Sequence, residues 1–271
     1  MTEPGAGRPH AEAATTRQPH AVLDLASRRH KGMKIERLLA LDQRPAPIRL
    51  LEVGTGSGGI AHYFGTHPSL RCDVDAVDVQ DNRLVREGYR YHAVHDTRLP
   101  FADASFDVVL SNHVIEHVGD RAAQRAHLAE LRRVLRADGV GYLAVPNRWM
   151  LVEPHYKLAF LSWLPRAWRS PYLRWRGRGE HYDCEPLRLP ELEALLREAG
   201  LRARHRGLEA LRLTFALERP HAVATRLLQR IPDAALAPFQ RLIPTLIYVF
   251  EREPGTVASA RTGGAAAGIE Q

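Results

Sequence analysis

Glycine residues are concentrated at one turn that follows a short apolar run. Residues 48–53 (Ile-Arg-Leu-Leu-Glu-Val) have the length and composition of a buried strand, and the chain continues as Gly54-Thr55-Gly56-Ser57-Gly58-Gly59. Glycine permits the unusual backbone angles and the close ligand approach that such a turn requires. A helix that begins there also offers unpaired N–H groups to a ligand. The pattern predicts a nucleotide-containing cofactor, although a plain tight turn has the same spacing.

Carboxylates at the ends of the predicted strands narrow the choice of cofactor. They are needed because the glycines alone also fit the spacing G-x-G-x-x-G of dinucleotide-binding enzymes. Glu52 lies beside the turn, where it would repel a pyrophosphate but suits the ammonium group of a methionine-like ligand. Asp78, followed by Val79, ends the next strand and can accept both hydroxyls of a ribose. Asp96, with Thr97 beside it, follows the third strand and suits an adenine amino group. Glu52 therefore favours a sulfonium nucleoside over NAD.

Histidines follow the fourth predicted strand, residues 106–111. His113, Glu116 and His117 lie at the edge where open α/β sheets hold their sites. If this stretch is helical, its spacing places both histidines on one face, and Glu116 could orient an imidazole. His117 is our first candidate for a base that deprotonates a hydroxyl acceptor, and a purely structural role for Glu116 and His117 is the alternative. Other histidines that could serve as the base are His113, His155 and His181.

The elements that must position these residues alternate along the chain. Apolar runs that indicate strands lie at 48–53, 74–79, 89–94, 106–111, 140–145, 208–213 and 246–251. Helix-length segments separate most of them, including 57–67, a short helix at 81–88, an amphipathic helix at 121–136 and a helix at 190–199. Runs that are apolar on both faces predict a mostly parallel, doubly wound seven-stranded α/β sheet. Near the N-terminus, a helix ending before Pro45 places Arg28, Arg29, Lys31 and Lys34 opposite its apolar side.

The alternation is interrupted after residue 146 by an aromatic and basic segment. Residues 148–185 contain all four tryptophans of the chain and several arginines. Aromatic walls bind flat or apolar molecules and arginine binds anions, so we expect a lid over the acceptor pocket. Phe160, Trp163 and Leu164 beside Arg166 and Arg169 would also suit contact with a membrane surface. We expect one domain over 21–254, with disordered tails at 1–20 and 255–271.

Composition limits the class of protein. The chain has 271 residues, a net charge of +7 and two cysteines, Cys72 and Cys184, far apart in sequence. We expect neither a disulfide framework nor a metal site, and the absence of a signal-peptide pattern favours the cytoplasm. The charge fits a solvated arginine-rich surface or an anionic partner. Without a compact basic block we expect no nucleic-acid partner, and the oligomeric state stays open.

Several motifs together resemble those of class I S-adenosylmethionine (SAM)-dependent methyltransferases. Residues 51–58 resemble the first motif of that family, and Asp78 matches its ribose-binding acid. Residues 95–109, 111–118 and 131–140 resemble its later motifs in the same order, and the small-molecule branch that includes the ubiquinone/menaquinone (type 11) enzymes is most similar. The resemblance implies a Rossmann-like fold and SAM as cofactor. It implies SAM contacts from Glu52, Gly54, Thr55, Gly56, Gly58, Asp78, Val79, Asp96, Thr97 and Asn112.

The predicted function is methyl transfer to a small molecule, most simply to a hydroxyl of a natural product or a lipid- or glycan-linked intermediate. N- or C-methylation, and a SAM-binding protein that transfers no methyl group, such as a cyclase, are alternatives. An NAD-dependent oxidoreductase is supported by the glycine spacing alone. Residues 111–114 (Ser-Asn-His-Val) lack the Asn/Asp-Pro-Pro-aromatic motif of enzymes that methylate base amino groups.

Overall fold

A seven-stranded sheet forms the centre of the protein. The computed structural model describes residues 24–153, 156–182 and 184–254. The strands lie in the order β3-β2-β1-β4-β5-β9-β8, and only β9 runs antiparallel to its neighbours. The mostly parallel, doubly wound α/β fold is therefore confirmed. The strand bounds are β1 Ile48–Val53, β2 Cys72–Asp78, β3 Arg90–Ala93, β4 Phe106–Asn112, β5 Leu135–Pro146, β8 Leu201–His205 and β9 Thr245–Arg252.

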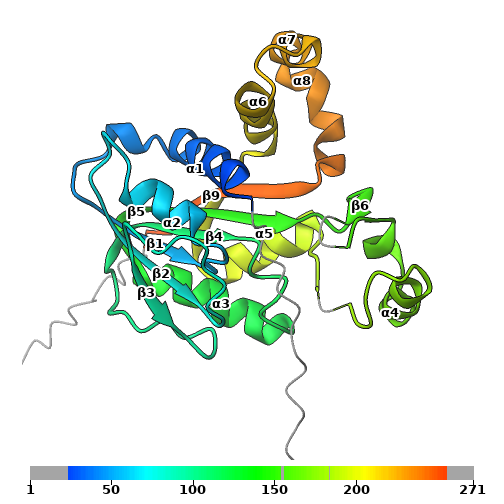
Figure 1. Cartoon of the computed structure of the whole chain (residues 1–271), viewed down its shortest axis with the longest axis horizontal. Helices are drawn as coiled ribbons and strands as arrows, with labels where there is room; N and C mark the ends of the chain where they lie inside the picture. The colour runs from blue at the N-terminus through cyan, green and yellow to red at the C-terminus, as the bar shows by residue number, and fades with distance from the viewer. Residues whose placement is uncertain (1–23, 154–155, 183, 255–271) are drawn as a thin grey trace, which may run out of the picture.

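Helices cover both faces of the sheet (Figure 1). α1 (Leu25–Leu39), α2 (Gly59–Gly65) and α6 (Gly207–Glu218) lie on one face, and α3 (Arg121–Val134) and α5 (Leu189–Glu198) lie on the other. Alternate strand residues enter the two cores, so that Leu50 packs with α1 and α2 while Leu51 packs with α3 and α5. Burial on both faces explains why the central strands β1 and β4 consist mostly of apolar residues.

Two segments extend from the carboxyl edge of the sheet (Figure 1). The segment after β5 contains β6 (Val152–Glu153), β7 (Leu158–Ala159), a 3₁₀ turn at Leu161–Trp163 and α4 (Arg166–Trp175), around a small core of its own. The segment between β8 and β9 contains α6, α7 (Val223–Arg230), α8 (Asp233–Leu236) and the 3₁₀ helix Ala237–Leu242. Buried Asn147 connects them, because its amide donates to the carbonyls of Arg241 and Ile243 while its Oδ1 accepts from Trp149 N–H.

Three local predictions were wrong. Residues 208–213 belong to helix α6 rather than to a strand, and a short apolar run cannot by itself distinguish the two. Residues 81–88 form no helix, because Asp81 accepts a hydrogen bond from the N–H of Arg83 and the N–H of Leu84 bonds to Ser57 O. Helix α3 ends at Val134, where β5 begins, rather than at the predicted Arg136.

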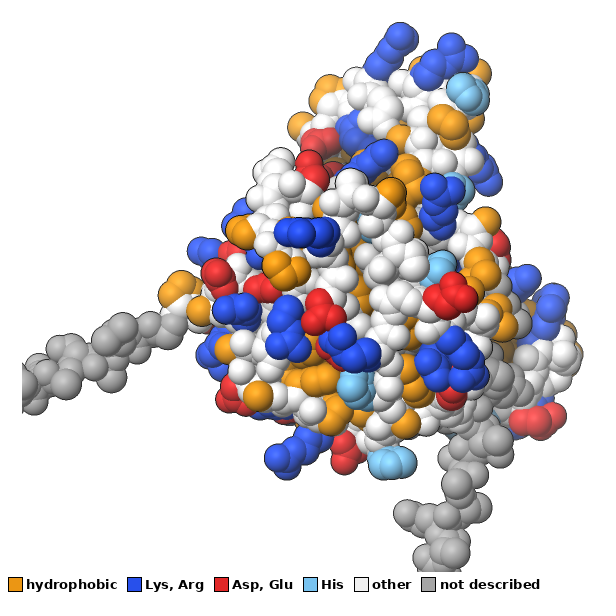
Figure 2. All heavy atoms as spheres, turned by 60° about the vertical axis from the view of Figure 1, so that its left-hand side comes forward, with side chains coloured by type: hydrophobic (Ala, Val, Ile, Leu, Met, Phe, Trp, Pro, Cys, Tyr) orange, Lys and Arg blue, Asp and Glu red, His pale blue; other side chains and the backbone are white. Residues whose placement is uncertain are grey.

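The surface charge is mixed over the face that Figure 2 shows, with lysine and arginine side chains interspersed with aspartate and glutamate. Arg90 pairs with Asp73 and Asp75, and Arg133 pairs with Glu130 and Asp103. Within the described residues, the helices are too short or too polar to cross a membrane. The two tails predicted to be disordered, 1–20 and 255–271, lie outside the described residues.

Candidate active site

The glycine turn connects β1 to α2 and folds onto the end of β2. Gly54, Gly56 and Gly58 all have positive φ angles, of 78°, 53° and 81°. Such angles strain any residue with a Cβ atom, which explains the glycines. A Cβ atom at Gly54 would lie 2.3 Å from Val114 Cγ2, so the turn after β4 is in direct contact with this one. Thr55 is buried, and its hydroxyl donates to Val77 O at 3.3 Å.

Asp78 holds the same turn from the end of β2. Its Oδ2 accepts a hydrogen bond of 2.8 Å from the N–H of Gly56, and its Oδ1 accepts one of 3.3 Å from Gln80 N–H. The side chain is partly exposed, and Val79 beside it is 46% exposed. A carboxylate has enough lone pairs to accept further hydrogen bonds, so this position remains suited to a ribose.

Glu52 is buried beneath the glycine turn. Its Oε2 accepts a hydrogen bond of 3.0 Å from Ala61 N–H in the first turn of α2. Burial raises the pKa of Glu52 to about 8, while the nearby Arg28 guanidinium and the Ala61 hydrogen bond favour the charged form. A cationic ammonium group at this position would lower that pKa again, because opposite charges stabilise each other in a buried site.

Asp96 and Thr97 lie beyond the end of β3, at the same sheet edge. Asp96 is exposed, and its Oδ1 accepts a hydrogen bond of 2.7 Å from Arg98 N–H. Thr97 is partly buried and lines a cavity of about 700 Å³ against helix α3. Both residues are thus near the strand end where an adenine was expected, and neither side chain is enclosed.

The turn after β4 brings both predicted histidines to one carboxylate. His113 Nδ1 lies 3.3 Å and His117 Nε2 lies 3.9 Å from Oε1 of Glu116, which is fully buried. The stretch is a turn rather than a helix: His113 has a φ of 58°, and His117 N–H donates to Val114 O at 2.8 Å. The predicted proximity is therefore present, although it arises from a different backbone.

Two buried polar atoms beside these turns show whether the site suits a polar cofactor. Asn112 Oδ1 at the end of β4 and Ser57 Oγ in the glycine turn are both buried, and within the described residues neither has a hydrogen-bond partner. Buried polar atoms without partners are costly, and a ligand with several donors would satisfy them. Together with Asp78 and Glu52, where the ribose and the ammonium group are expected, they fit SAM at this sheet edge.

Sequence reasoning missed the cations that α1 directs toward this site. Arg28 and Lys31 were assigned to the polar side of the predicted helix. In the structure the charge of Arg28 acts on Glu52, and that of Lys31 acts on Glu116. Gly59 makes this approach possible, because a Cβ atom there would lie 2.7 Å from Arg28 Cβ. Only the packing of α1 on α2 reveals which of its basic residues face inward.

The segment after β5 contacts the histidine turn through its far end. Cys184 is buried, with its Sγ 3.8 Å from His117 Nδ1, and Glu185 N–H donates to Glu116 O at 2.9 Å. His181 is exposed on the outer part of this segment, near Ser170. His155, the remaining candidate base, lies outside the described residues. The segment therefore borders the site at Cys184 rather than at His181.

His127 is a further buried group behind β4 that the sequence did not single out. Its Nε2 lies 3.0 Å from Ser111 Oγ, and burial lowers the pKa of the imidazole to about 4. The ring is therefore neutral at physiological pH. It supports β4 from the α3 side, next to the residues that carry the site.

Comparisons with known proteins agree on the family. A family model described as a methyltransferase domain matches residues 25–206. The ubiquinone biosynthesis O-methyltransferase of Brucella anthropi is 29% identical over 161 residues, covering 57% of this chain and 60% of that protein. The enzyme of the same name from Ruegeria pomeroyi is 28% identical over 188 residues, covering 66% of this chain and 69% of that protein. The chain thus spans three fifths of the length of the first of these relatives.

A solved structure shares the fold. The [4+2]-cyclase SpnF superimposes with a TM-score of 0.50 and 13% identity, covering 88% of this chain and 85% of that one. At this identity the likeness concerns the fold alone. The family model, by contrast, covers more than half of the chain and includes the glycine turn, the strand-end carboxylates and the histidine turn. The chain therefore belongs to the methyltransferase-domain family.

Proposed function

We propose that this protein transfers the methyl group of SAM to a hydroxyl oxygen of a small-molecule acceptor. The observation that carries the proposal is the buried Glu116 carboxylate with two imidazoles at 3.3 and 3.9 Å, at the sheet edge beside the cofactor turn. A hydroxyl is a weak nucleophile until a base removes its proton. The O-methyltransferase names of the relatives support the same acceptor atom.

The chain contributes alignment and proton acceptance. SAM supplies an electrophilic methyl group, so the carbon–sulfur bond breaks as the new carbon–oxygen bond forms. The hydroxyl proton passes to an imidazole, for which His113 and His117 are the described candidates. Glu116 stabilises the imidazolium that results, because an adjacent carboxylate favours the charged ring. The glycine turn and Asn112 hold the cofactor in line with the acceptor.

We further propose that residues 148–185 cover the acceptor. The segment is attached to the histidine turn through Cys184 and Glu185, and its small core contains Tyr156 and Tyr182. An apolar, aromatic cover excludes water from the reacting atoms. Replacement of residues 157–181 by a short glycine-serine linker should leave the binding of S-adenosylhomocysteine (SAH), the demethylated product of SAM, within about threefold and abolish transfer. Unchanged turnover would exclude this role.

The outer surface of α4 suits contact with a membrane, which would then be the source of the acceptors. Trp168 and Trp175 are 66% and 76% exposed, and the exposed Arg176 lies over the Trp175 ring. Exposed tryptophan beside arginine favours the interface of an anionic bilayer. We propose that this surface binds anionic membranes. The protein should sediment with phosphatidylglycerol vesicles but not with phosphatidylcholine vesicles, and Trp168→Ala/Trp175→Ala should abolish sedimentation. Sedimentation unaffected by the double substitution would refute the proposal.

The decisive test of the function is a transfer assay. Purified protein is incubated with methyl-labelled SAM and a panel of phenols, catechols, alcohols, amines and thiols, and products are identified by mass spectrometry. We expect label in methyl ethers. Label confined to amines or carbon would correct the acceptor atom. SAM binding without transfer to any of the panel would instead favour a protein that uses the cofactor without methyl transfer.

A further inference from the structure

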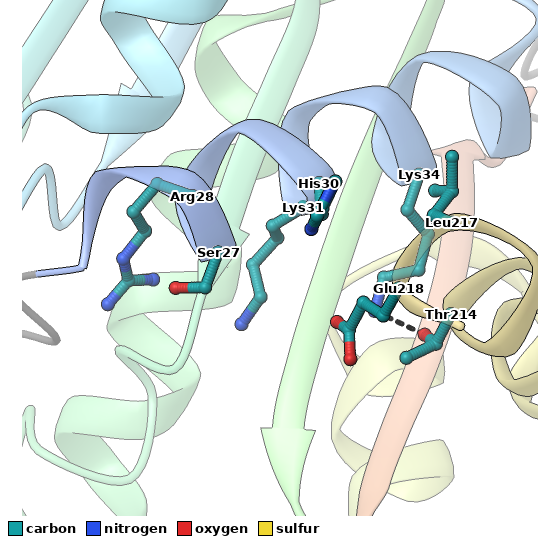
Figure 3. A pocket seen from close by; sticks show the side chains of 8 residues that line it. All are labelled: Ser27, Arg28, His30, Lys31, Lys34, Thr214, Leu217 and Glu218. Carbon is teal, nitrogen blue, oxygen red and sulfur yellow. Dashed lines mark hydrogen bonds between the residues drawn. The ribbon is translucent and has the colours of Figure 1, made fainter. Parts of the chain in front are cut away.

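A cavity of about 190 Å³ lies between α1 and α6, on the same face of the sheet as the glycine turn. Figure 3 shows Ser27, Arg28 and Lys31 projecting from one side of α1, while Lys34 turns toward Thr214 and Glu218 of α6. A water molecule needs about 30 Å³, so the cavity can hold a group of several heavy atoms. It is therefore large enough for a carboxylate or a phosphate.

The lining of the cavity is strongly cationic. It contains Arg28, Lys31 and Lys34, three residues apart along one side of α1, against a single carboxylate, Glu218. Lys34 Nζ donates to Thr214 Oγ1 at 3.1 Å. Within the described part of the chain, Lys31 Nζ forms neither a hydrogen bond nor an ion pair. Neither ammonium group is therefore paired with a described carboxylate, and Lys31 Nζ also lacks a described hydrogen-bond partner.

Lys31 is partly buried in this cavity. Burial, with Arg28 and Lys34 close by, lowers the pKa of Lys31 to about 7, although Glu218 and Glu116 partly offset this. An unpaired cation that has lost part of its hydration is less stable than in water, and an anion with matching geometry offsets that loss. These are the features of a binding site for a negatively charged group.

Arg28 and Lys31 act on different carboxylates of the candidate active site. Arg28 acts on Glu52, beneath the cofactor turn, whereas Lys31 acts on Glu116, which holds the candidate bases. Of these two cations, Lys31 is therefore the one whose charge acts on Glu116, after Glu218 of the cavity itself. We propose that this cavity binds a carboxylate or phosphate group of the acceptor through Lys31, so that the preferred acceptors are anionic hydroxy compounds. The part of this inference that concerns the acceptor rests on the proposed methyl transfer.

The test measures binding rather than turnover. Full-length protein loaded with SAH is titrated in a calorimeter with inorganic phosphate, pyrophosphate and benzoate. The unmodified chain is compared with Lys31→Met and Lys31→Arg. The matched control is Arg29→Met, because Arg29 is an exposed residue of the same helix. One charge-assisted hydrogen bond contributes about 1.5–3 kcal/mol, and 1.4 kcal/mol corresponds to a tenfold change. We expect at least one anion to bind, Lys31→Met to weaken it at least about tenfold, and Lys31→Arg and Arg29→Met to bind it within about threefold.

Each other outcome has a defined meaning. If none of the three anions binds, or if Lys31→Met binds them unchanged, the cavity is not an anion site. If Lys31→Met weakens SAH binding as strongly as anion binding, the anion is the cofactor's own carboxylate and the acceptor assignment is overturned. NMR of ¹³C-methylated lysines confirms folding of the variants and should show the Lys31 pKa rising when the anion binds. Failure of methyl transfer would appear only in the transfer assay, which these titrations do not use.

Discussion

The backbone N–H of Gly56 donates a hydrogen bond of 2.8 Å to Asp78 Oδ2, which joins the glycine turn after β1 to the end of β2. One carboxylate therefore shapes the cofactor turn and also lies where a ribose is expected. The two roles are coupled, because loss of the carboxylate would release the turn and remove the acceptor of the ribose hydroxyls.

Asp78→Ala should weaken SAH binding on the order of 100-fold, because two charge-assisted hydrogen bonds of about 1.5 kcal/mol are lost. Calorimetric titration with SAH measures the effect. Asp73→Ala, at the opposite end of the same strand and paired with Arg90, is the control and should change the affinity less than twofold. Equal affinities of the two variants would remove Asp78 from the cofactor site.

Gly54→Ala and Gly177→Ala separate two effects of adding a Cβ atom. Both glycines have positive φ, but a Cβ at Gly54 meets Val114 whereas none of the neighbouring atoms lies within 4 Å at Gly177. Gly177→Ala should cost about 1 kcal/mol of unfolding free energy from strain alone. Gly54→Ala should cost about 1–3 kcal/mol more from overpacking and should also weaken SAH binding. Urea unfolding curves give both values, and equal losses would show that Val114 moves aside freely.

The two histidines beside Glu116 should differ in their contributions to turnover. Loss of the true base lowers kcat by about 10²–10⁴-fold, whereas SAH affinity should stay within about threefold. His113→Ala and His117→Ala, compared under saturating SAM, identify which imidazole accepts the proton. Glu116→Gln should lower kcat as well, because the neutral amide no longer stabilises the imidazolium. Turnover unaffected in both histidine variants would refute base catalysis by this turn.

The lowered pKa of His127 predicts that the protein loses stability in acid. Its folded-state pKa of about 4 lies below the unfolded value of 6.5, so between these pH values only the unfolded chain binds the proton. The free energy of unfolding should then fall by about 1.4 kcal/mol per pH unit as pH drops from 6.5 toward 4. His127→Gln should make this slope shallower, whereas His221→Gln, at an exposed position, should not. Parallel slopes in the unmodified chain and His127→Gln would contradict the assignment.

The lowered pKa of Lys31 predicts a second dependence of stability on pH, at higher pH than that of His127. Its folded pKa of about 7 lies below the ordinary value of 10.5, so the cost of burying the cation is full below pH 7 and declines as pH rises toward 10.5. The groups that face it are Arg28, Lys34, Glu218 and Glu116. Lys31→Met should therefore raise the unfolding midpoint more at pH 6 than at pH 9, as calorimetry can measure. A uniform shift at both pH values would mean that Lys31 carries no titrating cost.

The sequence by itself determined the fold class and the cofactor, and it placed the candidate site residues at strand ends. Strand-length apolar runs alternate with helices, and the glycine turn and Asp78 follow strand ends, which parallel pairing brings to one edge. These features are local, because they depend on residue type and spacing within single elements. The same is true of His113, Glu116 and His117, whose closeness follows from their short separation along the chain.

Only the tertiary structure decided which side chains from distant elements face that edge. Lys31 and Arg29 are both basic residues of one helix, yet packing of α1 against α6 places Lys31 in the cavity with Glu218 and leaves Arg29 exposed. Residues 208–213 were likewise predicted to be a strand and form a helix, because a short apolar run does not distinguish the two. Local patterns determine which elements form. Which face of an element is buried depends on contacts with elements remote in sequence, and those contacts decide which charged side chains line the cavity.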